Sequence, residues 1–267
     1  MLEIIVLALI GLSGGDEPKP PTKAELAEIT IRGRDLAGYD AAAWHASDAV
    51  METRPKPGAF QQYIAQKTAK GWTVAFGRLN EKRDRFLIAY EATQGAKPDA
   101  FTVKPVDPPR ADAGFVLAAA LAIETALADF TNHFEGEQRP YNVYVLPAPK
   151  GRLWTYLLPA QTKAKVWPLG GDVRYLVSPD GKKILEKRQM HKSIIELEQR
   201  EGDPSQLVAG THTHVLSEIP EDSDVFHVLA RKPAVAELVC TEHCVFVVEP
   251  DGAIKFVGKP NDVFQKK

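Results

Sequence analysis

Short stretches of strand-forming residues, separated by turn formers, fill the second half of the chain and limit what it can fold into. Each stretch is rich in β-branched and aromatic residues. The stretches are residues 141–148, 152–160, 172–178, 182–188, 207–215, 236–240, 244–249 and 253–258. Two of the intervening turns, at residues 179–181 and 250–252, read Pro-Asp-Gly, which suits a tight turn because proline fixes φ and glycine accepts a positive φ. This half therefore predicts a mixed or antiparallel sheet.

Two segments in the same half predict helices. Residues 113–130 are apolar almost all round, which is typical of a helix buried in a protein core. Glu124 interrupts the apolar run, and the segment lies in the middle of the chain, so we expect no stable membrane span. Residues 191–203 combine isoleucine and leucine with several glutamates, a composition that suits a short helix.

The first half of the chain predicts one long helix followed by strands. Apolar residues recur at near-helical spacing over residues 22–50, and Thr22 with Glu25 forms a capping-box pattern at the start. Three alternating segments follow and predict an antiparallel meander with the helix packed on one side. These segments are residues 63–68, 72–79 and 85–92.

A segment rich in proline and turn formers, residues 94–112, predicts a domain boundary near residue 108. The fold class that we expect is α+β. A helix plus an antiparallel β-meander would form an N-terminal domain over residues 22–108. A strand-rich domain with one buried helix and a mixed or antiparallel sheet would follow over residues 109–267.

Residues 1–21 predict a signal peptide and a disordered tether. Residues 4–10 are apolar and small residues follow them, as in a short export signal, although Glu3 stands where a basic residue is usual. This pattern favours a periplasmic or secreted protein, and the first strand of a cytosolic domain is the alternative. The formal net charge is -2, and no long basic run is present. We therefore expect a protein or peptide partner of unknown identity and no nucleic acid.

The chain contains two cysteines, Cys240 and Cys244. In one extended strand they would lie about 13 Å apart, because a strand rises about 3.3 Å per residue. A disulfide needs Cα atoms within about 7 Å, so the pair can form one only across a tight turn. The alternative is a pair of metal ligands joined by His243, although the second half of a four-ligand zinc motif is missing.

The segment 210–227 raises the clearest chemical question, because it holds three of the seven histidines. In an extended strand His212 and His214 lie on the same face, about 6.6 Å apart along the strand. Two such imidazoles can bind one zinc ion, and Asp222 and Asp224 follow after a loop. A catalytic zinc keeps one coordination position open for water, and a nearby carboxylate then acts as the general base.

This segment resembles the JAMM metallopeptidases, the MPN-domain family, whose signature is His-x-His followed by serine and aspartate, with a glutamate on an earlier strand. The resemblance covers roughly residues 113–258. It implies that His212, His214 and Asp224 are zinc ligands and that Glu135 or Glu137 is the catalytic base. The sequence departs from the signature because valine follows the second histidine in place of proline, and the aspartate comes one residue early.

The sequence also allows other arrangements of the histidines. His191 and His227 would join the pair in a four-histidine cluster if their segments lie beside it, and Asp172 could also reach the site. Alternatively, the histidines are partly exposed strand residues beside an acidic loop. Two functions therefore remain. One is a non-catalytic exported protein with a binding or structural role, with zinc or no cofactor, and the other is a zinc-dependent hydrolase.

Overall fold

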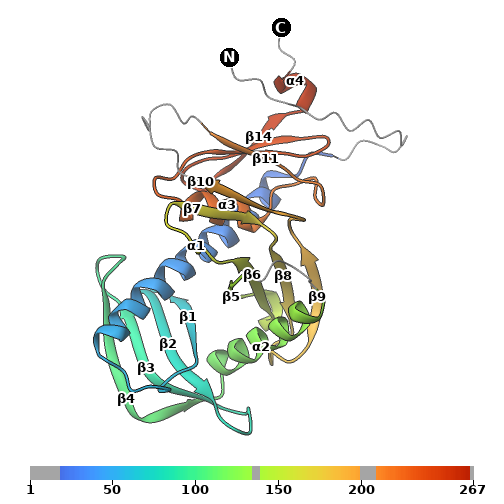
Figure 1. Cartoon of the computed structure of the whole chain (residues 1–267). Helices are drawn as coiled ribbons and strands as arrows, with labels where there is room; N and C mark the ends of the chain where they lie inside the picture. The colour runs from blue at the N-terminus through green and yellow to red at the C-terminus, as the bar shows by residue number, and fades with distance from the viewer. Residues whose placement is uncertain (1–18, 134–138, 199–208, 265–267) are drawn as a thin grey trace.

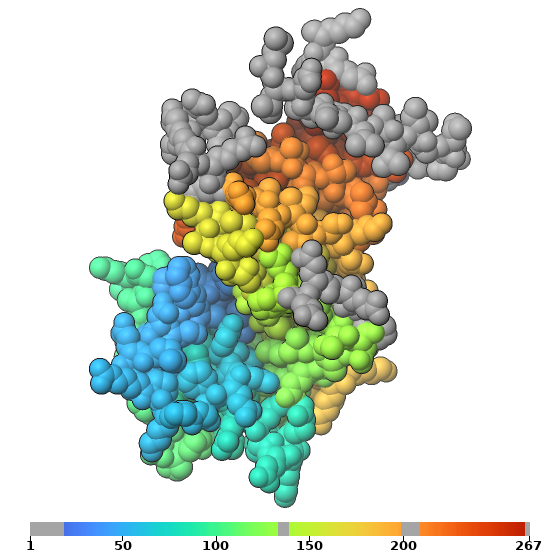
Figure 2. Space-filling model, viewed as in Figure 1, coloured from blue at the N-terminus to red at the C-terminus, as the bar shows by residue number. Residues whose placement is uncertain are grey.

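A computed structural model describes residues 19–133, 139–198 and 209–264 of the chain (Figure 1). The predicted export segment lies outside the described residues. The described part contains four α-helices and fourteen strands in four sheets, and only one strand pair is parallel. The expected α+β class is confirmed. Figure 2 shows the N-terminal sheet at one end of the molecule and the C-terminal sheet at the other.

The long N-terminal helix is α1 (Lys23–Glu52). The capping box predicted at its start is present. The Thr22 backbone N–H donates to Glu25 Oε2 at 2.7 Å, and the Glu25 N–H donates to Thr22 Oγ1 at 3.2 Å. The helix packs on an antiparallel sheet of order β1-β2-β3-β4. Its strands are β1 (Gln62–Thr68), β2 (Gly71–Leu79), β3 (Phe86–Gln94) and β4 (Phe101–Asp112).

The fourth strand of this sheet corrects the sequence analysis. The proline-rich segment 94–112, in which we predicted a domain boundary, contains all of β4, which includes Pro105, Pro108 and Pro109. Proline lacks a backbone N–H, and β4 tolerates it because β4 is an edge strand that pairs only with β3. The division of the chain into two domains near residue 108 stays a prediction. Nevertheless, residues from both sides of it share one hydrophobic cluster, in which Trp72 and Tyr144 take part.

The helix predicted over residues 113–130 is α2 (Phe115–His133). It lies on an antiparallel sheet of order β5-β6-β8-β9 and packs there through small residues such as Ala119 and Ala126. The strands are β5 (Tyr141–Pro147), β6 (Leu153–Pro159), β8 (Val173–Val177) and β9 (Ile184–Gln189), with a short 3-10 helix, η1 (Pro149–Gly151), between the first two. Within the described ranges, α2 alone is long and apolar enough to span a membrane, and one third of that stretch is buried in the fold. Residues 119–123 are buried in succession, so the middle of α2 is buried all round, between this sheet and the N-terminal sheet.

A two-stranded sheet replaces the short helix expected over residues 191–203. Its strands are β7 (Val166–Gly170), which the sequence analysis missed, and β10 (Ile194–Glu198). Ile194 pairs with Gly170 and Glu198 with Val166 in antiparallel register. The helix prediction was wrong because a partner strand from another part of the chain pairs with this segment, and tertiary pairing outweighs local propensity.

The last sheet has the order β11-β12-β13-β14, with β11 parallel to β12 and the other pairs antiparallel. Its strands are β11 (Gly210–Thr213), β12 (Glu237–Cys240), β13 (Val245–Val248) and β14 (Ile254–Gly258), and α4 (Pro260–Phe264) follows. Helix α3 (Asp222–Ala230) lies between this sheet and α1. Val225 and Val228 of α3 share a hydrophobic cluster with Leu26, Ile29 and Phe246. A tight turn separates β12 from β13, and both cysteines beside it are free thiols.

Gly33 lies at a point where α1 packs closely against α3. A Cβ atom added there would lie 2.4 Å from the Cβ of Val225 and 2.6 Å from the backbone oxygen of Asp222. We expect Gly33→Ala to destabilise the protein by about 1–3 kcal/mol, because overpacking there outweighs the gain in helix propensity of about 1 kcal/mol. Urea unfolding measures this change. Gly114→Ala is the matched control, since its nearest neighbour would be 3.8 Å away, and an equal loss in both variants would contradict the prediction.

Candidate metal centre

The end of β11 brings the two histidines of the His-x-His segment together. The Nε2 atoms of His212 and His214 are 3.1 Å apart, so the two rings converge. Only 7% of His212 and 5% of His214 is exposed. The alternative of partly exposed strand histidines is therefore wrong, and the pair forms part of a buried site.

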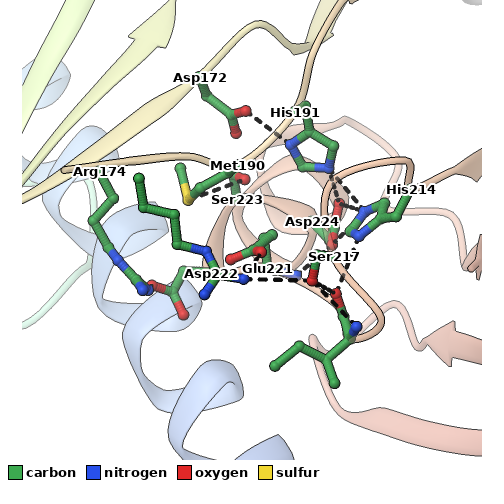
Figure 3. Close-up of polar contacts among 12 residues, drawn as sticks. Asp172, Arg174, Met190, His191, His214, Ser217, Glu221, Asp222, Ser223 and Asp224 are labelled. Atoms are coloured by element: carbon green, nitrogen blue, oxygen red, sulfur yellow. Dashed lines mark hydrogen bonds and ion pairs between the residues drawn. The ribbon is translucent and has the colours of Figure 1, made fainter. Parts of the chain in front are cut away.

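Two further side chains converge on the same point. His191, which follows β9, places its Nε2 atom 2.8 Å from Nε2 of His214. Asp224, in the first turn of α3, places Oδ1 3.0 Å from Nε2 of His212 and 3.1 Å from Nε2 of His191. Its Oδ2 atom lies 3.2 Å from Nε2 of His214. These four buried residues form a group whose ligand atoms all lie within 4.8 Å of one another. Figure 3 shows three of them, His191, His214 and Asp224.

Each imidazole is held by an acceptor at its other ring nitrogen. Nδ1 of His191 lies 2.8 Å from Asp172 Oδ1, and Nδ1 of His212 lies 3.0 Å from Glu237 Oε1. Nδ1 of His214 lies 3.1 Å from the backbone oxygen of Ile219. An acceptor at Nδ1 favours the proton there and leaves the Nε2 lone pair free, which is how proteins orient histidine ligands toward a metal ion.

The donor set fits a transition-metal ion. Three imidazole nitrogens and one carboxylate oxygen are ligands that zinc accepts, in a tetrahedron with bonds of about 2.0–2.2 Å. Such bonds separate neighbouring ligand atoms by about 3.3 Å. Five of the six pairs among the four side chains are 2.8–3.4 Å apart, and the sixth, His191 with His212, lies within 4.8 Å. These separations are close to those of a tetrahedral zinc site, so the four side chains can act as its ligands after small shifts of the rings.

The first turn of α3 is anchored so that Asp224 faces the histidines. The Glu221 backbone N–H donates to Oδ2 of Asp224 at 2.7 Å. The neighbouring Asp222 is fully buried and accepts hydrogen bonds from several elements. Its donors are Arg32 Nε of α1 at 2.9 Å, the Tyr156 hydroxyl of β6 at 2.8 Å and Arg174 Nη1 of β8 at 2.6 Å. Figure 3 shows Asp222 and Glu221 between Arg174 and the histidines.

The cluster attracts positive charge. Burial by itself lowers the pKa of His212, but hydrogen bonds to Asp224 and Glu237 outweigh burial and raise that pKa to about 9. Burial also opposes ionisation of Asp224, yet His214 and His191 hold the pKa of this carboxyl well below its usual range. The carboxylates therefore favour a cation among the rings, which is either a proton or a metal ion.

The other candidate site residues from the sequence do not belong to the group of four ligands. Glu135 and Glu137 lie outside the described residues, so the structure does not place the expected base. Asp172 reaches the site, but it holds His191 and does not face the centre. His227 is buried in α3 and is not a member of the four-residue group, and burial lowers its pKa well below the usual range.

The alternative metal pair of cysteines is not assembled in the described part of the chain. His243 groups with Glu218 and Glu242 at a partly exposed position, without either cysteine. The sequence analysis also missed Glu237, which holds His212. Its signal was an acidic residue at the start of an otherwise apolar strand, which is unusual because a buried carboxylate needs a partner.

Comparisons of this chain with models of protein families, with curated proteins and with solved structures find no match.

Removal of the Asp222 carboxylate should destabilise the fold. We expect Asp222→Ala to lower the free energy of unfolding by about 3–5 kcal/mol, because it leaves the two guanidinium groups without their buried partner. Chemical unfolding followed by circular dichroism measures the change. Asp35→Ala is the control, because it removes only the exposed pair with Lys67 and should cost less than about 1 kcal/mol. Similar losses in the two variants would show that the buried Asp222 network stabilises the fold no more than the Asp35–Lys67 pair does.

Proposed function

We propose that this chain is a metal-binding protein in which one divalent transition-metal ion, with zinc the first choice, has a structural role. The ligands are His191, His212, His214 and Asp224. One observation carries the proposal: three imidazole Nε2 atoms converge on one carboxylate while every Nδ1 atom has an acceptor of its own. Imidazole ligands suit zinc, copper, iron and nickel, and a four-ligand set without an open position is typical of structural zinc.

The charges of the site support a divalent cation. Asp172, Asp224 and Glu237 bring three negative charges into the buried cluster, and Arg231, which donates to Glu237 Oε2 at 2.8 Å, brings one positive charge. With neutral imidazoles the group therefore has a net charge of -2. Unpaired buried charge is costly, so a dication would neutralise the cluster without protons on the rings.

The ion would join three parts of the fold. His191 extends from the sheet that contains β9, His212 belongs to the sheet that contains β11, and Asp224 comes from α3. A cross-link among these three elements would stabilise the folded chain, since binding to the folded state alone adds its free energy to folding. This role agrees with a non-catalytic exported protein that presents a stable surface to a protein or peptide partner.

A zinc-dependent hydrolase is the second candidate. Asp224 lies in the first turn of a helix after the His-x-His strand. This favours the hydrolase, because in the JAMM metallopeptidases, which the segment resembles, the aspartate opens a helix. His191 argues against the hydrolase, because a fourth protein ligand occupies the position that a catalytic zinc keeps open for water.

Metal analysis of the purified protein tests the proposal. We expect about one zinc per chain in the wild type, by plasma mass spectrometry, and strong loss of metal in His191→Ala, His212→Ala and His214→Ala. His45→Ala is the matched control, because His45 lies on α1, stacked on Trp44, and should leave the metal content unchanged. Failure of the wild type to bind zinc, copper, iron or nickel after dialysis against each ion would refute the proposal.

Cobalt substitution separates the two candidate functions. Co²⁺ in the site absorbs visible light, and its spectrum changes when an added ligand enters the coordination sphere. We expect azide to leave the spectrum of the wild type unchanged, because protein ligands fill all four positions. His191→Gly binds metal more weakly, so it is measured in excess Co²⁺, where it should respond to azide because it vacates one position. A clear azide response of the wild type would favour the hydrolase.

A further inference from the structure

A hollow lies on the sheet β5-β6-β8-β9, next to the first turn of α3. Its volume is about 430 Å³, and it is lined by Trp154, Arg174, Leu176, Glu186, Lys187 and Arg188. Trp154 comes from β6, and the other residues come from β8 and β9. The hollow shares no residue with the four proposed metal ligands.

Two guanidinium groups meet on adjacent strands at this hollow. Arg174 and Arg188 are Cα partners in the antiparallel pairing of β8 with β9. Like charges directly opposite each other are destabilising, so this pair needs compensation. Arg174 donates to Asp222, and Arg188 donates to Glu221, both at the start of α3. The two buried carboxylates hold the guanidinium groups in place and offset most of their charge.

The guanidinium groups keep N–H donors that no described residue uses. A guanidinium group has five N–H donors. The contacts of Arg188, to Glu221 and Ser217, run through Nη2 alone, so its Nε and Nη1 atoms have no partner among the described residues. Nε of Arg174 is buried and also lacks a partner there. The side chain of Arg188 is 42% exposed, so a ligand can reach it.

Two apolar side chains, Trp154 and Leu176, also line the hollow. The guanidinium carbon of Arg174 lies 4.7 Å from the ring centroid of Trp154, and Leu176 is buried beside them. A guanidinium fork pairs well with a planar carboxylate, and an indole ring packs well against a flat apolar group. Lys187 is engaged by Asp129 at 2.6 Å and Glu186 opposes added negative charge, so a singly charged ligand fits better than a multiply charged one.

We propose that this hollow is a binding site for a small aromatic monocarboxylate. The carboxylate accepts hydrogen bonds from the free donors of Arg188, and the ring packs against Trp154 and Leu176. The site is independent of the proposed metal function, because none of its lining residues is a ligand.

Titration of the full-length protein with benzoate, followed by NMR of the tryptophan indole N–H signals, tests the proposal. We expect saturable shifts of the Trp154 signal, assigned by comparison with Trp154→Leu. Arg188→Gln should weaken binding about tenfold or more, because it removes a charged hydrogen-bond donor. Lys183→Gln, an exposed change in the same β8–β9 hairpin, should bind as the wild type does.

Two further ligands identify the chemistry that is recognised. Benzyl alcohol has the same ring without the charge and should bind at least about tenfold more weakly than benzoate. Inorganic phosphate should bind more weakly than benzoate as well, because it has no ring. Equal binding of benzyl alcohol, tighter binding of phosphate, or unchanged benzoate binding by Arg188→Gln would each overturn the proposal. Trp154→Leu is a second test if Arg188→Gln fails to fold, because it keeps every charge of the site. We expect it to bind benzoate more weakly than the wild type does, as measured by calorimetry.

Discussion

Two buried carboxylates in the first turn of α3 organise the described structure. Asp222 accepts hydrogen bonds from Arg32, Tyr156 and Arg174, while Asp224 faces three imidazoles. A buried carboxylate costs several kcal/mol unless charged or polar groups compensate it. The α1 helix and two of the sheets must therefore all deliver donors to this one turn, and that requirement determines how they meet.

The need to compensate buried charge also explains why the groups that hold the histidine rings have partners of their own. Asp172 and Glu237 orient two of the rings, and Arg231 in turn neutralises Glu237. Such an arrangement is typical of histidine ligands, whose outer partners set the tautomer and the direction of each ring. A cluster of this kind without a bound cation would have to retain protons on its rings. Protons and the proposed metal ion would therefore compete for this site.

Some of the fold and part of the site could be predicted because the causes are local. The capping box of Thr22 and Glu25 and most of the strand segments depend on residues a few positions apart. Where a distant segment decided the outcome, prediction failed. Residues 194–198 form a strand because β7 pairs with them, and the proline-rich β4 is a strand because its outer edge needs no partner.

The sequence by itself determined that His212 and His214 project to one side, since the side chains of a strand alternate between its two faces. It also placed an acidic turn a short distance after them. Only the tertiary structure decided that His191 joins the pair, that Asp172 and Glu237 hold two of the rings, and that His227 does not take part. These residues come from separate elements, and their meeting depends on sheet pairing and on the packing of α3, which no local pattern encodes.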